Sequence, residues 1–142
     1  MNSILDKEPV KRAEKSIKEF DPSLKIVCLE QTARTAQDAA TALGCNVGAI
    51  VKSLLFKYIE NNEYYLCLVS GDQYMSIEKL SDITNGKIVK ANADECKEYT
   101  GFSIGGVSPF AHKTKPTKIR TGNKKETWTT HCVCCKSFIS LF

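Results

Sequence analysis

Apolar residues recur at helical spacing near the start of the chain. Residues 8–20 carry four of them on one face, opposite a charged face: Val10, Ala13, Ile17 and Phe20. Because a residue that precedes proline is pushed out of the helical region, the Asp21-Pro22 step predicts the end of this helix. The next segment, LKIVCLE at residues 24–30, alternates well enough to predict a strand.

A second helix and a pair of strands are predicted next. Thr35 is a suitable N-cap with an acidic residue three positions later, and Gly44 is a suitable C-terminal stop. The nearly continuous apolar block within residues 46–60 predicts a buried strand that is entered through a helical turn. A turn at Asn61-Asn62 separates it from the strand EYYLCLVSG, so we expect the two strands to pair antiparallel.

The remaining pattern predicts four shorter elements: a helix over residues 76–83, a strand over 87–91, a helix over 92–101, and a strand over 102–110 that runs into a glycine-rich turn. Ser76 and Asn92 are suitable N-caps, and Gly101 is a suitable C-terminal stop. The elements therefore follow in the order α β α β β α β α β. This order predicts one α/β (α+β) domain with a mixed sheet.

Composition agrees with such a domain. Of the 142 residues, 42% are apolar and 25% are charged, which is ordinary for a globular protein. No apolar run is long enough to cross a bilayer, and the charged N-terminal segment is not typical of an export signal, which favours the cytoplasm. The seven cysteines are then expected to be free thiols, in agreement with their odd number.

Charge is distributed unevenly along the chain. Residues 1–112 hold 13 basic and 15 acidic residues, whereas residues 113–142 hold seven basic residues and one acidic residue. A basic segment of this kind favours a phosphate-rich partner, although a solvated, lysine-rich edge gives the same pattern.

Lys52 is the first candidate for chemistry. It stands in AIVKSLLF, a segment otherwise suited to burial, and a lysine rarely enters a core without a partner or a task. Alternation along the strand could instead place it on the solvent face, with its stem over apolar neighbours. In the functional interpretation, the ammonium group lines a pocket and holds an anion or polarises a carbonyl group.

The stretch GFSIGGVSPFAH at residues 101–112 is the second candidate. Its glycines and proline are consistent with a plain tight turn, or with a cradle whose backbone N–H groups bind a carbonyl oxygen or an oxyanion. Ser108 lacks the surroundings of a nucleophile elbow. His112 could act as a general base, but a histidine beside a lysine run is more often simply exposed.

Other classes of site are not supported by the sequence. It contains no Walker motif and no dinucleotide fingerprint, and its carboxylates are scattered without catalytic spacing. The tail HCVCCK, His131 to Lys136, is spaced too tightly for a structural zinc site. We therefore expect neither a metal nor a cofactor.

Three segments in a fixed order carry a resemblance to a known family. RTAQDAATALGCNVGAIVKSLLF, LVSGD and TGFSIGGVSPFAH together resemble the YbaK family of aminoacyl-tRNA deacylases, whose fold is also that of the editing domain inserted in bacterial prolyl-tRNA synthetases. The resemblance spans residues 23–118 and is specific as a combination. It implies a single domain over residues 1–142 with a mixed, curled β-sheet flanked by helices.

The resemblance also implies a function and a site. The expected reaction is trans-editing, which is hydrolysis of the ester that joins a wrong amino acid, Cys or Ala, to tRNA(Pro). Lys52 and Gly106 match the catalytic positions, and the substrate would be bound by Ser53, Gly105, Val107, Ser108, Pro109 and His112. The tRNA backbone would be contacted by Lys113, Lys115 and Lys118. The expected partners are an aminoacylated tRNA and, as a docking partner, prolyl-tRNA synthetase.

After KPTKI the resemblance fades. Residues 119–142 lack the Ala/Gly-rich ending of the family, which leaves one wall of the pocket unassigned. The alternative is therefore a non-catalytic module of the same fold that binds tRNA or a synthetase. A third interpretation, a plain globular domain with a structural lysine and structural glycines, is disfavoured by the joint order of the motifs.

Overall fold

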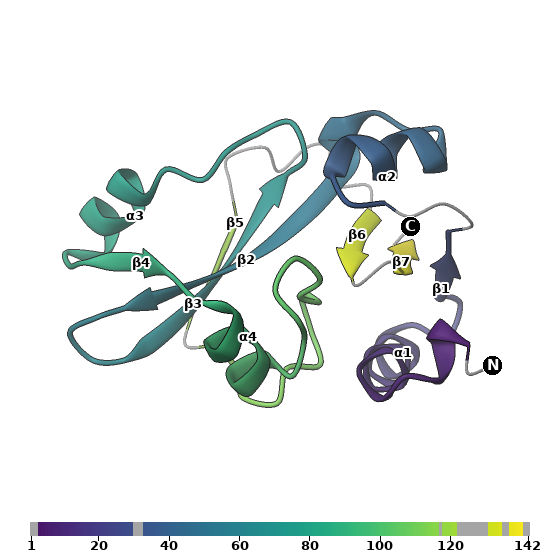
Figure 1. The fold of residues 1–142 in the computed structure, drawn as a ribbon, viewed down its shortest axis with the longest axis horizontal. Coiled ribbons are helices and arrows are strands. Elements are labelled where there is room, and N and C mark those ends of the chain that lie inside the picture. The colour runs from purple at the N-terminus through teal and green to yellow at the C-terminus, as the bar shows by residue number, and fades with distance from the viewer. Residues whose placement is uncertain (1–2, 30–32, 117, 122–130, 135–136, 141–142) are drawn as a thin grey trace.

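The computed structural model describes residues 3–29, 33–116, 118–121, 131–134 and 137–140, with side chains in the first two ranges (Figure 1). The helices are the short η1 (Ile4–Asp6) and η2 (Val47–Ala49), and the longer α1 (Glu8–Phe20), α2 (Ala36–Leu43), α3 (Ile77–Thr84) and α4 (Ala93–Thr100). The strands are β1 (Lys25–Cys28), β2 (Ile50–Tyr58), β3 (Glu63–Ser70), β4 (Ile88–Lys90), β5 (Lys118–Thr121), β6 (His131–Cys134) and β7 (Ser137–Ser140). Within these residues, no helix is long and apolar enough to span a membrane.

The predicted helix boundaries are confirmed to within a residue. The Thr35 side chain accepts a hydrogen bond from the backbone N–H of Asp38, and the Asp38 carboxylate accepts one from the backbone N–H of Thr35, so the start of α2 is a complete capping box. Gly44 and Gly101 end α2 and α4 in the left-handed conformation, which glycine adopts without steric cost. Local sequence signals therefore decide where the helices begin and end.

The seven strands form one mixed sheet. Their order is β1-β7-β6-β2-β3-β5, and β4 pairs with β2 outside this path. The long β2–β3 hairpin is antiparallel, from Val51 opposite Ser70 to Tyr58 opposite Glu63, as the sequence predicts. The pairs β2–β6 and β3–β5 are parallel, which confirms a mixed sheet. In Figure 1 this hairpin runs diagonally through the molecule, with α2 at one end and α3 at the other.

One edge of β2 changes its partner partway along the strand. The β3 strand occupies one edge of β2, from Val51 to Tyr58. Both β6 and β4 therefore pair with the opposite edge of β2. The β6 strand pairs only at Ile50 and Val51, and β4 pairs from Phe56 onwards. Between them, residues 52–54 face no strand on this edge within the described part of the chain. The sheet is therefore interrupted at Lys52.

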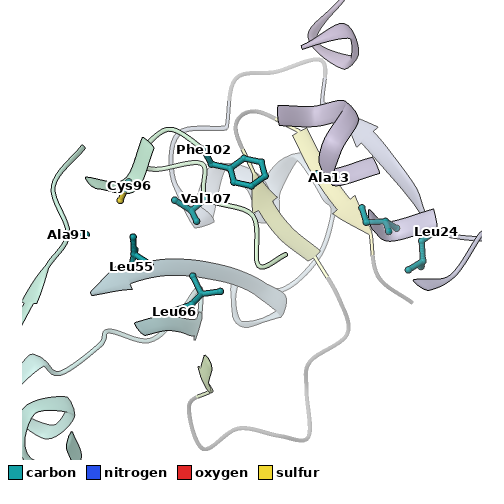
Figure 2. Packing of buried hydrophobic residues seen from close by; sticks show 9 residues of the cluster. Ala13, Leu24, Leu55, Leu66, Ala91, Cys96, Phe102 and Val107 are labelled. Atoms are coloured by element: carbon teal, nitrogen blue, oxygen red, sulfur yellow. The ribbon is translucent and has the colours of Figure 1, made fainter. Parts of the chain in front are cut away.

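Alternation along the hairpin separates two parts of the core. Leu55 and Leu66 are cross-strand partners and join a cluster formed with α1, α4 and residues 101–112, the glycine-rich loop. Figure 2 shows Leu55 beside Cys96 and Val107, which belong to the same cluster. The next residues along the strands, Phe56 and Tyr65 among them, pack in a second cluster with Leu80 of α3. Both faces of this hairpin are thus covered, which explains the continuous apolar run in β2.

The predicted strand over residues 102–110 is wrong. This segment is a loop, because Gly101 turns the chain and the backbone N–H of Phe102 is bound by the side-chain oxygen of Thr100 at 3.0 Å. The last strands of the sheet come from the tail instead. There β6 and β7 connect β2 to β1, so the divergent residues 119–142 contribute backbone to the fold.

Candidate functional site

A cavity of about 750 Å³ lies at the interruption in the sheet. It is enclosed by the start of α2, the β2 segment around Lys52, the loop after β3, the end of β4, one residue of α4 and the glycine-rich loop. The lining residues that matter here are Arg34, Lys52, Ser53, Leu55, Asp72, Tyr74, Lys90, Ala91, Cys96, Ile104, Gly105 and Val107. This size suits a small ligand, or the end of a larger one.

Lys52 is half-buried, and its ammonium group is held at the cavity wall. Nζ donates a hydrogen bond to the backbone carbonyl oxygen of Gln73 at 2.6 Å. The same nitrogen lies 5.1 Å from the centre of the Tyr74 ring, within the range of a cation–π interaction. Burial lowers the pKa of Lys52 below its ordinary value, and the Asp72 carboxylate acts in the opposite direction. Lys52 is therefore neither a core residue nor a solvated surface lysine.

The loop that carries Asp72 and Gln73 is fixed by short hydrogen bonds. The hydroxyl oxygen of Ser70 lies 2.6 Å from Oδ1 of Asp72 and 2.7 Å from the carbonyl oxygen of Gly48. The backbone N–H of Gly71 donates to the carbonyl oxygen of Ile50 at 2.6 Å. A side chain at Gly71 has no room, because its Cβ would lie 2.3 Å from a backbone oxygen of η2.

The glycine-rich loop begins with a type II turn. The backbone N–H of Gly106 donates to the carbonyl oxygen of Ser103 at 3.0 Å, and Gly105, the third residue of the turn, has a φ of +82°. A turn with a positive φ at its third residue alone is type II, and this conformation favours glycine at that position. Ile104, at the corner before it, is 45% exposed and lines the cavity. The turn thus presents Ile104 and Gly105 to the cavity and uses the Gly106 amide to close itself.

The end of this loop is held from behind by His112. Its Nε2 forms a short hydrogen bond with the carbonyl oxygen of Ser108, and a carbonyl oxygen can only accept, so Nε2 carries the proton. The ring also lies edge-on to Phe102. Nδ1 is buried without a partner among the described residues. Burial lowers the pKa of His112 and outweighs the hydrogen bond to Ser108, which acts in the opposite direction, and the nearby Arg12 charge lowers the pKa further. The structure therefore accommodates the neutral imidazole.

Ser108 has no access to the cavity. Its side chain is fully buried, and its hydroxyl oxygen accepts a hydrogen bond from the backbone N–H of Phe110 at 3.3 Å. This local bond shapes the turn around Pro109. Ser108 therefore stabilises the loop conformation in the structure.

The structure brings part of the predicted site together. Lys52, Ser53, Gly105 and Val107 line one cavity although they come from segments about fifty residues apart along the chain. Four other predicted residues of the glycine-rich loop lie outside the lining: Gly106, Ser108, Pro109 and His112. Of the predicted backbone-binding lysines, Lys113 and Lys115 are exposed beyond the same loop. The side chain of Lys118 lies outside the described side chains. The same holds for the side chains of the HCVCCK segment, for which the sequence disfavours a zinc site.

Sequence reasoning missed several lining residues. Asp72 stands in the LVSGD motif, which offered a signal, whereas Tyr74 and Cys96 carried none in their local pattern. Arg34 and Lys90 add two exposed basic groups to the cavity wall beside Lys52. Three basic side chains against the one acidic side chain of Asp72 make the described wall attractive to anions. Only the folded chain shows this excess, because the three basic residues are dispersed in the sequence.

The fold and the cavity define a small α/β domain with an anion-attracting site at an interrupted sheet edge. A sequence model of the aminoacyl-tRNA editing domain matches residues 30–121. The chain therefore belongs to the aminoacyl-tRNA editing domain family, as the resemblance predicted.

Individual relatives agree with this assignment. The chain is 34% identical over 111 residues to a proline–tRNA ligase of Fervidobacterium nodosum, covering 78% of this chain and 17% of the ligase. It is 32% identical over 81 residues to the uncharacterized protein YwhH of Bacillus subtilis, covering 57% of this chain and 51% of YwhH. The chain thus spans about a sixth of the first relative and about half of the second.

A solved structure matches along most of its length. It is provisionally described as a crystal structure of a trans-editing enzyme for prolyl tRNA synthetase. The TM-score is 0.80 at 30% sequence identity, and the match covers 95% of this chain and 87% of the other. The mixed sheet with flanking helices is therefore the fold of that protein as well.

Proposed function

We propose that this chain hydrolyses the ester bond between a small, wrongly attached amino acid and tRNA(Pro). The observation that carries the proposal is the cavity at the interrupted edge of β2, where Lys52 and the Gly105 turn line the same space. Family membership supports an aminoacyl-tRNA substrate, and the proline–tRNA ligase relative favours tRNA(Pro). We propose that the amino acid removed from the tRNA is alanine or cysteine.

The reaction needs position and charge stabilisation more than a protein nucleophile. A water molecule, or a hydroxyl or thiol of the substrate itself, attacks the ester carbonyl carbon. The carbonyl oxygen becomes an oxyanion, the bond to the ribose oxygen breaks, and that oxygen takes up a proton. In the case of water, the products are a free amino acid and tRNA with a free terminal hydroxyl.

Lys52 holds the end of the tRNA in this proposal. An ammonium group has three N–H donors, and the carbonyl oxygen of Gln73 takes one of them. The other donors can bind a ribose hydroxyl or phosphate oxygen. Arg34 and Lys90 also line the cavity, and their positive charges would attract the phosphates at the acceptor end of the tRNA. The exposed Lys113 and Lys115 would extend this contact along the tRNA backbone.

The glycine-rich turn stabilises the oxyanion in this proposal. The Gly106 amide already donates to the carbonyl oxygen of Ser103, so Gly106 acts by closing the turn. The donor that we propose for the oxyanion is the amide of Gly105, which lines the cavity. Val107 and Ser53 complete the wall around the ester.

The cavity floor supports a small amino acid. Leu55, Ala91, Cys96 and Val107 are buried, line the cavity and belong to the core cluster of Figure 2. Tightly packed core residues yield little room for a larger side chain. A floor of this kind admits a methyl or thiol group more easily than a branched or aromatic one.

The test is deacylation of Ala-tRNA(Pro) and Cys-tRNA(Pro) by the purified protein, beside Lys52→Ala and correctly charged Pro-tRNA(Pro). Lys79→Ala is the matched control, since Lys79 is an exposed lysine of α3 outside the cavity. We expect hydrolysis of a mischarged tRNA by the wild type and by Lys79→Ala, with loss in Lys52→Ala. A folded wild type that hydrolyses neither substrate contradicts the proposal, and retained tRNA binding would then favour the non-catalytic module.

A further inference from the structure

Tyr74 is an almost fully exposed aromatic residue of the cavity lining. The residue is 95% exposed, although it lines the same cavity as Lys52. Most large apolar side chains are at least partly covered in folded proteins, because burial of their surface is favourable. Among the exposed large apolar residues that the structure describes, only Tyr74 and Ile104 belong to the cavity lining. An aromatic ring is thus left uncovered where the ligand would enter.

The backbone beneath Tyr74 is held in place. The N–H of Gln73 donates to the carbonyl oxygen of Ser70 at 3.0 Å, which closes a turn directly before Tyr74. Ser76, two residues later, caps the first turn of α3 through the backbone N–H of Lys79. Tyr74 is therefore displayed from a short loop with both ends fixed, which limits the cost of ordering the backbone that carries the ring when a ligand binds.

One side of the ring is already occupied by a charge. The Lys52 ammonium lies 5.1 Å from the ring centre and is itself fixed by the carbonyl oxygen of Gln73. A ring that is 95% exposed still offers a broad surface to a second partner. The partner that such a surface binds best is a flat, uncharged, aromatic group, because stacking buries one face of the ring and one face of the partner. Nucleobases have this character and stack on aromatic side chains regardless of sequence.

We propose that Tyr74 is a stacking platform for a nucleobase, and that its occupant is the adenine at the 3′ end of the aminoacylated tRNA. The inference rests on the proposed function, since that function places the terminal nucleoside at this cavity. Lys52 then contacts the ribose or phosphate of the nucleoside whose base lies on Tyr74. Ile104, on the rim formed by the type II turn, gives the base a second apolar neighbour.

The test separates the base from the rest of the substrate. Two non-hydrolysable probes are titrated by calorimetry: alanine joined by an amide bond to the 3′ position of adenosine 5′-monophosphate, and the same compound without the base. The protein is the full chain as wild type, Tyr74→Ala, Tyr74→Phe and Phe20→Ala. Phe20 is the matched control, because it is 86% exposed and lies outside the cavity at the end of α1.

We expect Tyr74→Ala to weaken binding of the adenine probe about fivefold to a hundredfold, the range typical of one base–aromatic stack. Tyr74→Phe and Phe20→Ala should bind this probe as the wild type does. Binding of the probe without a base should be the same in all four proteins. Equal weakening of both probes by Tyr74→Ala, or no weakening of either, would overturn the platform.

Kinetics distinguish stacking from an effect through Lys52. Stacking holds the substrate equally before and during reaction, so Tyr74→Ala should raise KM for Ala-tRNA(Pro) and leave kcat near the wild-type value. A fall in kcat at unchanged KM would mean that Tyr74 merely orients Lys52, and the stacking inference would be wrong. If the wild type binds the adenine probe through Tyr74 but hydrolyses no ester, the platform stands and the proposed hydrolysis fails.

Discussion

Nε of Arg12 on α1 donates a hydrogen bond to the carbonyl oxygen of Ala111 at 2.8 Å, across 99 positions of sequence. The guanidinium also lies 4.8 Å from the centre of the Phe102 ring and reaches the carbonyl oxygen of Thr100 at 3.4 Å. It therefore touches both ends of the glycine-rich loop. The N-terminal helix is in this way a support for the loop that lines the cavity.

Removal of this support should weaken both stability and activity. We expect Arg12→Ala to lower the free energy of unfolding by about 1.5–3 kcal/mol, the usual range for a hydrogen bond to a charged group. Deacylation should slow because Gly105 loses its fixed position. The measurements are urea unfolding and single-turnover deacylation. Glu8→Gln is the control, since Glu8 contacts Arg12 only from a 70% exposed position on α1. An Arg12→Ala protein as stable as the wild type would contradict this role.

His112 should make stability depend on pH. Its pKa is lowered from the ordinary value of 6.5 by burial, so the unfolded chain binds a proton more readily than the folded one. Stability from this group is therefore complete above about pH 6.5 and declines as the pH falls toward the lower folded value. We expect urea midpoints of the wild type to fall more steeply between pH 7.5 and 5.5 than those of His112→Gln. Parallel curves would show that His112 does not titrate in this way.

Substitution by alanine should destabilise the protein to different extents at two glycines of the cavity wall. Gly105 has a left-handed φ but open space at its Cβ position, so Gly105→Ala should cost about 1–2 kcal/mol of backbone strain alone. Gly71→Ala should cost more, since its Cβ would collide with the backbone oxygen of Val47 at 2.3 Å and displace η2. Urea unfolding of both variants measures this order. A Gly71→Ala protein more stable than Gly105→Ala would contradict it.

Cys96 lines the cavity but should not act as a nucleophile. Burial raises the pKa of its thiol, and the nearby Glu95 carboxylate acts in the same direction, so the reactive thiolate is disfavoured. We expect Cys96→Ala to deacylate mischarged tRNA at a rate close to the wild type. Iodoacetamide at pH 8 should label the exposed Cys28 well before Cys96, as peptide mass spectrometry can measure. Rapid labelling of Cys96, or loss of hydrolysis in Cys96→Ala, would point to covalent chemistry instead.

Local pattern predicted the helices well because their signals lie within a few residues. The Thr35 cap, the Gly44 stop and the apolar face of α1 act over one or two turns, and each was confirmed. The strand prediction after Gly101 was wrong because the signal there is not local. Its apolar residues, Phe102 and Val107, are buried against α1, α4 and β2, so their hydrophobicity reflects long-range packing and carries no strand.

The sequence by itself determined the order of elements as far as α4 and the family, and it singled out Lys52 as a lysine in an apolar strand. It did not determine that Lys52 lines a cavity, which explains the presence of a lysine in this strand. Pairing partners of a strand are chosen by the whole fold, and hydrophobic periodicity records which face is buried but not which strand lies alongside. Only the tertiary structure placed β6 beside Ile50 and Val51, and β4 beside Phe56 to Tyr58, with the cavity between them.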